Sequence, residues 1–320
     1  MRISAWFGLL LAAMALGGPA RADEWPTRPI RVIVPFPPGG PADVVGRIVA
    51  PKLGEALGQT LLIDDRGGAD GIIGSDMVAK ASPDGYTLLL TPSSYAMHPA
   101  TYSNMPFDPA TGMVPVSLLV AAQFVLVVTP SLPVHTVPEL IDYAKKHPGE
   151  LDYASAGAGG PTHLAFELFK MATGTNIVHV PYKGGGPALV AMAGGETQVM
   201  MAPILAAMPM VQAGQLRALA VSGPQRTPSA PDLPSIGETV PGFSAVTWYG
   251  MLAPVGTPPA IIQRLNHEID TVLQDPDTVK RFGAIGGDPV GGPPDVLAKQ
   301  IAEDIPKWIK VAKEANVHID

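Results

Sequence analysis

Short apolar runs alternate with segments of helical spacing along almost the whole chain, and this alternation limits the fold more than any other feature. Residues 30–34 form a compact apolar strand, and 43–57 follow with apolar side chains at helical spacing. The same order continues through 61–90 and returns from 137 to 221. Strands that alternate with helices predict parallel sheets covered by helices on both faces. We therefore expect an α/β protein.

Two apolar segments, 123–129 and 246–252, interrupt the alternation, and a proline-rich turn follows each of them. We expect both to cross between two doubly wound lobes with a ligand cleft between them. The alternative is one continuous sheet, for which about 300 residues would be long. Three helices at 259–273, 276–282 and 293–315 are expected to end the chain, and no internal repeat stands out. The predicted lobes are 23–124 with 253–320, and 125–252.

The first residues have the three parts of a secretory signal peptide. Arg2 precedes an apolar run over 5–17, and Ala20-Arg21-Ala22 is a small-x-small cleavage signal. A bilayer span needs about 20 apolar residues, so this run is too short to be an anchor. We predict a signal peptide over 1–22, cleavage after Ala22, and a soluble periplasmic protein. The chain contains no cysteine, which excludes disulfides, thiol catalysis and Cys-ligated zinc.

The overall charge is mildly acidic, with a formal net charge of −7 at pH 7. No cluster of Lys and Arg forms a stripe, so a nucleic-acid partner is not expected. An anionic ligand would be repelled by the overall field and would have to be recognised locally. Backbone N–H groups at helix starts are the natural donors for such recognition.

The loop between the first strand and the first helix is rich in glycine and lies at the carboxyl end of a strand, where ligands bind in open α/β sheets. Its glycines let the backbone approach a ligand closely. Asp43 follows at the helix start, where it would cap the helix or hold a bridging water rather than contact a ligand anion. The candidate ligand-binding residues of this loop are Phe36, Pro38, Gly39, Gly40 and Asp43.

A second loop of the same kind begins after the strand at 151–154. Thr162 is a candidate N-cap, and His163 in the first helical turn could donate to an anion or simply pack. The candidates here are Ala156, Gly157, Gly160, Thr162 and His163. Two further strand ends add Lys183, as a possible positive charge or an ordinary surface lysine, and the hydroxyl-bearing Ser93, Ser94 and Tyr95. Four such loops favour a small polar or anionic ligand.

Motifs of enzymes were not found. There is no Gly-x-Ser-x-Gly elbow and no Walker loop, and the seven histidines are scattered without metal-ligand spacing. Ser155 and His163 could suggest a Ser–His site, but the sequence places no acid to orient the histidine. We expect neither catalysis, nor a metal, nor a cofactor.

Several longer motifs together resemble one family. They are WPTRPI (25–30), FPPGG (36–40) with Asp43 and Arg47, ASPDGYTLL (81–89), YASAG (153–157), THLAFELF (162–169), VPYKGGGPAL (180–189), GQLRALAVS (214–222) and APVGTP (253–258). In this order they are similar to the substrate-binding proteins of tripartite tricarboxylate transporters, also called the Bug family. The resemblance covers essentially the whole chain after the leader.

The resemblance implies a type II periplasmic-binding fold that closes on a carboxylate and delivers it to a permease of one large and one small membrane subunit. It also implies that the 36–40 loop and the loop before Thr162 hold the ligand carboxylate, the first often through water. Amino-acid-binding relatives carry an Asp after the strand that here ends at Met201, where this chain has Ala202 and Pro203. We therefore expect a ligand without an ammonium group, such as a mono- or dicarboxylate or an aromatic acid, with Pro203 near it.

Two other functions remain as alternatives to the transport receptor. A periplasmic sensor that reports the ligand to a signalling protein would need the same trap. A hydrolase on this scaffold would need Ser155 or His163 for turnover. The protein is expected to be a monomer.

Overall fold

The computed structural model describes residues 25–318, apart from the side chain of Leu205. The predicted signal peptide and its cleavage site lie outside the described residues. None of the described helices is both long enough and apolar enough to cross a membrane.

The first part of the chain forms a parallel three-stranded unit with the order β2-β1-β3. The two inner strands, β1 and β3, are largely buried, which is why they read as nearly continuous apolar runs, whereas the edge strand β2 is mostly exposed or half-buried. The elements are β1 (Ile30–Val34), α2 (Pro41–Leu57), β2 (Leu61–Asp65), η1 (Ala69–Gly71), α3 (Ile72–Ala79), β3 (Thr87–Pro92) and α4 (Ser94–Thr101).

The middle of the chain repeats this arrangement around a second core. Strand β5 pairs in parallel with β6 on one side and β7 on the other. The elements are α5 (Val137–Lys146), β5 (Asp152–Ser155), α6 (Pro161–Thr173), β6 (Val178–Pro181), α7 (Gly185–Ala193), β7 (Val199–Pro203), α8 (Ile204–Gln212), β8 (Arg217–Val221) and η2 (Ile236–Glu238). The α/β prediction is confirmed.

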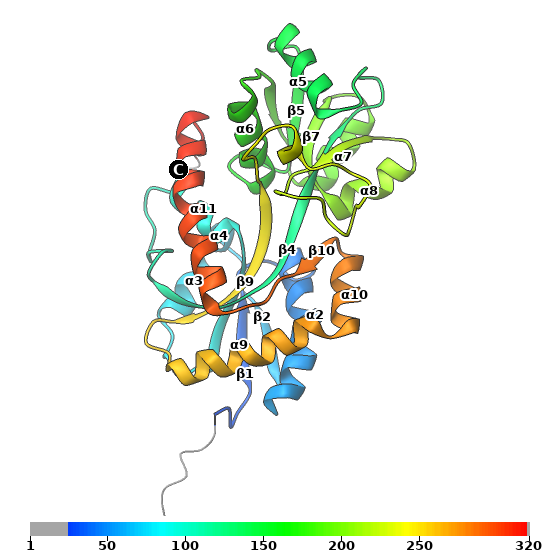
Figure 1. Cartoon of the computed structure of the whole chain (residues 1–320). Helices are drawn as coiled ribbons and strands as arrows, with labels where there is room; N and C mark the ends of the chain where they lie inside the picture. Colours follow the sequence, from blue (N-terminus) through cyan, green and yellow to red (C-terminus); the bar gives the residue numbers. More distant parts are fainter. Residues whose placement is uncertain (1–24, 319–320) are drawn as a thin grey trace, which may run out of the picture.

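Two long antiparallel strands, β4 (Met113–Val128) and β9 (Val246–Pro254), run between these two halves (Figure 1). Their pairing runs from Met113 opposite Pro254 to Gln123 opposite Val246. Beyond Gln123, β4 leaves β9 and pairs with β7 and β8. The side-chain amide of Gln123 lies at the point where β4 leaves β9. Its oxygen accepts the N–H of Gly223 at 2.6 Å, and its nitrogen donates to the carbonyl of Gln225 at 3.0 Å. Both apolar segments expected to cross, 123–129 and 246–252, thus lie almost entirely within these two strands.

The first crossing strand begins earlier than expected, at Met113 rather than near residue 123. Pro115 lies inside it, and proline normally argues against a strand interior. The pairing with β9 shifts register between Pro115 and Ser117, and such irregularities accommodate a proline. The strand is thus longer than its sequence pattern indicates.

The chain ends in α9 (Pro259–Gln274), α10 (Pro276–Ala284), the short strand β10 (Gly287–Pro289) and α11 (Pro294–Glu314). All three helices were predicted, but β10, which pairs with β4, was not. The two ends of α11 pack in different cores. Leu297 and Ile301 contribute to a core with Trp248, whereas Trp308 and Val311 contribute to the core of the second half with Phe166. In Figure 1, α11 extends from the first half alongside the second.

Candidate ligand-binding site

The predicted loops gather into two groups, one in each half of the molecule. The loops after β1 and β3 leave the same edge of the first half, because these strands are parallel neighbours. The loops after β5, β6 and β7 likewise share an edge of the second half. The candidate residues therefore lie at the carboxyl ends of parallel strands, where open α/β sheets bind ligands.

The first loop ends in a helix start that no side chain caps. Gly40 is the N-cap of α2 with φ −74° and ψ 167°, and Pro41 is the first helical residue. Gly39 before it has φ +80°, in the left-handed region that favours glycine. The N–H of Ala42, the second helical residue, has no acceptor among the described residues, as is usual in a first helical turn. Phe36 is half-buried, and its ring packs where Gly71 has no side chain.

Asp43 holds this loop from inside the helix. It is 3% exposed, and its Oδ2 accepts the N–H of Gly39 at 2.8 Å. Its Oδ1 lies 2.6 Å from Nε of Arg47, which also reaches Asp65 at 3.4 Å. Burial alone would raise the pKa of Asp43, but the bonds from Arg47 and Gly39 together hold that pKa below its usual range. The simple capping role predicted for Asp43 is therefore wrong, since Gly40 occupies the N-cap.

The second loop has the same design. Gly160 is the N-cap of α6 with φ −76° and ψ 171°, Pro161 is the first helical residue, and no side chain caps the start. Gly159 has φ +71°, and its N–H donates to Nδ1 of His163 at 2.8 Å. Gly39 with Asp43 and Gly159 with His163 thus form the same local arrangement in the two halves, which was not predicted from the sequence.

Thr162 does not occupy the N-cap predicted for it. Proline is favoured at the first helical position, so Pro161 begins the helix and the N-cap is Gly160, two residues before Thr162. The Thr162 hydroxyl instead accepts the N–H of Ala156 at 2.9 Å and closes the loop across its ends. The backbone N–H of Thr162 has no acceptor among the described residues.

Two histidines stack beside the second loop. The rings of His163 and His179 lie 3.7 Å apart and nearly parallel, and Tyr153 stacks on His179 at 4.8 Å. His179 was not singled out from the sequence. Ser155 lies 2.7 Å from Nε2 of His179 and is fully buried, so the Ser155–His163 pairing considered for a hydrolase is not formed. Burial lowers the pKa of both histidines to about 4.

The remaining candidates differ in exposure. Ser93 is the N-cap residue of α4, and its hydroxyl lies 3.1 Å from that of Thr247 on β9. The Ser94 hydroxyl is buried without a hydrogen-bond partner in the described part of the chain. Tyr95 is fully buried and stacks on Phe107 in the core, so we assign it a packing role. Lys183 is exposed after β6, and Pro203 is a partly exposed N-cap of α8.

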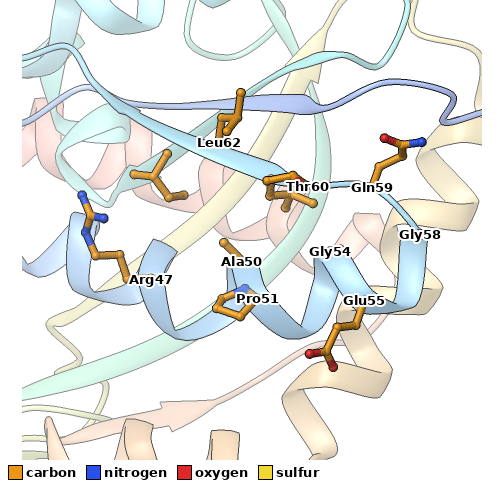
Figure 2. Close-up of a pocket in the computed structure, with 11 residues that line it drawn as sticks. Arg47, Ala50, Pro51, Gly54, Glu55, Gly58, Gln59, Thr60 and Leu62 are labelled. Carbon is orange, nitrogen blue, oxygen red and sulfur yellow. The ribbon is translucent and has the colours of Figure 1, made fainter.

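A cavity of about 850 Å³ lies elsewhere, between α2 and the edge strand β2 (Figure 2). Its lining includes Arg47, Gly54 and Leu62 but none of the predicted ligand-binding residues. Among residues 25–318, no three His, Asp or Glu side chains are placed to hold a metal ion together. The loops before α2 and α6, unlike this cavity, combine unpaired N–H groups at a helix start with glycines that let a ligand approach the backbone.

Comparison with known proteins gives a consistent picture. The model of the tripartite tricarboxylate transporter family receptor matches residues 45–317. Protein BugT of Bordetella pertussis is 38% identical over 321 residues, which cover 99% of this chain and 98% of that protein. A solved R. palustris protein with adipate is 37% identical with a TM-score of 0.78, covering 92% of this chain and all of that one. MatC from Rhodopseudomonas palustris with bound malate is 31% identical with a TM-score of 0.73, and the match covers 90% of this chain and 99% of that one.

Proposed function

This chain belongs to the tripartite tricarboxylate transporter receptor family, and from that premise we propose that it captures a small carboxylate between two lobes and delivers it to a membrane transporter. Receptors of this family are periplasmic, and the family and its structural neighbours are solute-binding proteins rather than enzymes. We further propose that residues 1–22 are the export signal and that the working protein is a monomer. Its transporter would consist of one large and one small membrane subunit.

The observation that carries the proposal is the pair of matching helix starts. Each half offers an uncapped helix N-terminus that follows a left-handed glycine, at Gly39 and at Gly159. Such N-termini attract anions through their unpaired N–H groups and the positive end of the helix dipole. Because the net charge of the chain is −7, a carboxylate would have to be recognised by these local donors.

The proposed cleft lies between lobe 1, made of 23–124 and 253–320, and lobe 2, made of 125–252. In support, β4 and β9 run between the halves, and each half carries its own core. The proposed ligand contacts are Phe36, Pro38, Gly39, Gly40, Ser93, Ser94, Ala156, Gly157, Gly160, Thr162, Lys183 and Pro203. Asp43 and His163 belong to the same loops, but each accepts a backbone N–H of its own loop, from Gly39 and Gly159 respectively.

We propose a ligand without an ammonium group. An amino acid bound in such a cleft requires an anionic partner for its ammonium, and the carboxyl end of β7 supplies none. Ala202 is fully buried there, and Pro203 is the N-cap of α8. The solved neighbours that contain adipate and malate hold carboxylates of this kind.

A thermal-shift screen of the mature protein against mono-, di- and aromatic carboxylates tests the proposal. A ligand at 100-fold its dissociation constant adds about 2.7 kcal/mol to the free energy of unfolding, which a melting curve resolves. We expect at least one carboxylate to raise the melting temperature, and the matching amino acids to have less effect. A library-wide absence of stabilisation, or stabilisation by aspartate and glutamate above succinate and glutarate, would contradict the proposal.

A further inference from the structure

His163 can hold the second loop in only one protonation state. Its Nδ1 accepts the N–H of Gly159 at 2.8 Å, so this nitrogen carries no proton and the neutral ring has its hydrogen on Nε2. A protonated imidazole carries N–H groups on both nitrogens and would place a donor against a donor at Gly159. The loop geometry seen here therefore requires a neutral ring.

His179 extends the same support to the other side of the loop. Its Nε2 lies 2.7 Å from the Ser155 hydroxyl, and that hydroxyl is also 3.3 Å from the N–H of Gly157. The two imidazoles stack at 3.7 Å with only 9° between their planes. Two positive charges at that separation would repel strongly in a partly buried site, so the stack also favours neutral rings.

Asp43 provides the matching case in the first half. It stands four residues after Gly39, as His163 stands four residues after Gly159, and accepts the glycine N–H at the same distance of 2.8 Å. Both side chains are almost fully buried, at 3% and 5% exposed. Each therefore acts on the backbone of its loop rather than presenting itself to a ligand.

We propose that His163 and His179 are positioning residues of the second ligand loop, and that Asp43 has the same role in the first. They hold the glycine backbone so that the N–H groups of the following helix remain directed to the ligand carboxylate. The effect on ligand affinity rests on the proposed function, whereas the effect on the loop itself does not.

The groups around the two rings come from three elements. Glu167 and Lys170 lie on α6, and Tyr153 lies on β5. Near the end of the chain, Glu314 and His318 line a cavity of about 610 Å³ that His163 and His179 also line. Glu167 is the group that would favour a protonated ring. Its Oε1, however, already accepts from Tyr153 at 2.5 Å and from Lys170 at 2.7 Å, and it lies 3.9 Å from Nε2 of His163. The lowered pKa of both rings agrees with this arrangement.

The loop can be tested without any ligand by measuring hydrogen exchange of the Gly159 amide in the mature protein. His163→Phe keeps a ring that stacks on His179 but removes the acceptor, and we expect Gly159 exchange to rise at least tenfold. His163→Asn keeps an acceptor at the position of Nδ1 and should stay within about threefold of the wild type. His147→Phe is the matched control, because His147 also stacks on a tyrosine, Tyr143, away from the loop.

Two more readouts separate positioning from a general packing role. The ¹⁵N spectrum at pH 5.5 should show His163 neutral with a bare Nδ1, whereas a histidine with the usual pKa of about 6.5 is mostly protonated there. If His163→Phe fails to fold, Asp43→Leu against Asp43→Asn tests the same rule at the Gly39 amide. Unchanged exchange at Gly159 or Gly39 in the acceptor-free variants, or a protonated Nδ1, would overturn the proposal.

The consequence for binding is measured by calorimetry with adipate at pH 7.5. We expect His163→Phe to weaken binding at least tenfold and His163→Asn to restore it to within about threefold. Equal affinity in the wild type and His163→Phe would overturn the link between loop and ligand. Adipate that fails to bind the wild type counts against the proposed function instead, and the amide exchange then still decides the positioning role.

Discussion

The indole Nε1 of Trp248 donates a hydrogen bond of 2.7 Å to Oδ2 of Asp304 and so ties the crossing strand β9 to the last helix, α11. Both residues are buried, and Gln300 donates to the same oxygen at 2.9 Å. Trp308, one turn beyond Asp304, already belongs to the core of the second half. The bond therefore fixes α11 at the point where it passes from one core to the other.

Replacing Asp304 with alanine should lower the free energy of unfolding by about 2–4 kcal/mol, because the buried indole N–H loses its acceptor. Asp304→Asn retains an acceptor and should cost about 1 kcal/mol or less. Urea denaturation of the two variants checks this. A loss below about 0.5 kcal/mol in the alanine variant would show that the bond does not hold α11 in place.

Acidification should weaken the fold through the stacked histidines. Burial, with smaller contributions from neighbouring charges, lowers the pKa of His163 and His179 to about 4, whereas the unfolded chain titrates near 6.5. Between these values the unfolded state binds more protons, so the free energy of unfolding falls as the pH drops from 6.5 to 4 and changes no further on their account below 4.

Because the two rings are coupled and His179 is partly exposed, we expect the pair together to account for about 3 kcal/mol of this loss. Urea midpoints at several pH values, compared with a His163→Asn/His179→Asn double variant, isolate the contribution. The double variant should show a flatter dependence, and parallel curves would contradict the assignment.

Gly39→Ala should damage ligand binding more than the fold. Gly39 has φ +80°, and a Cβ there would meet nothing within 4 Å, so the cost is backbone strain of about 1 kcal/mol. Gly174, at the end of α6, has φ +65° and equally open space, which makes Gly174→Ala a matched control. We expect similar losses of stability but a tenfold or greater loss of affinity only in Gly39→Ala. Equal affinities would place the site elsewhere.

Pro203→Asp should shift the preference toward amino acids. Aspartate is a favoured N-cap, so the change is compatible with the start of α8, and it adds the acid that an ammonium group requires. The ratio of aspartate to succinate affinity should rise at least tenfold. Pro203→Asn, which caps equally well without the charge, is the control and should leave the ratio near that of the wild type. An unchanged affinity ratio in Pro203→Asp would show that residue 203 does not lie near the ligand.

Much of the fold was predictable because its signals are local. The helices α2, α5, α6 and α9 follow apolar periodicity and proline starts that lie within each segment. The differences occur where distant contacts decide. Proline normally argues against a strand interior, so only the pairing with β9 makes Pro115 part of a strand, and the three residues of β10 are a strand only because they pair with β4. A short helix was expected only near 208–213, whereas α8 begins at Ile204 and continues through Pro209.

The glycine-rich loops of the proposed site could be located from the sequence, but their internal hydrogen bonds could not. Residues 291–295 read Gly-Gly-Pro-Pro-Asp, closely similar to Gly39 to Asp43, yet the N–H of Gly291 donates to Leu118 on β4 instead of to Asp295. Closely similar sequences thus form different loops, depending on which strand lies nearby. His179 was missed for a related reason, since only the pairing of β6 with β5 brings it beside Tyr153.

Calorimetry with a carboxylate and its uncharged amide tests the central claim most directly. The best carboxylate from the thermal-shift screen would be titrated into the mature protein beside its primary amide, which has nearly the same shape without the charge. We predict one site per chain for the carboxylate, at least 100-fold weaker binding of the amide, and recovery of the intact ligand afterwards. Equal binding of the amide, or conversion of the ligand, would contradict capture of a carboxylate without chemistry.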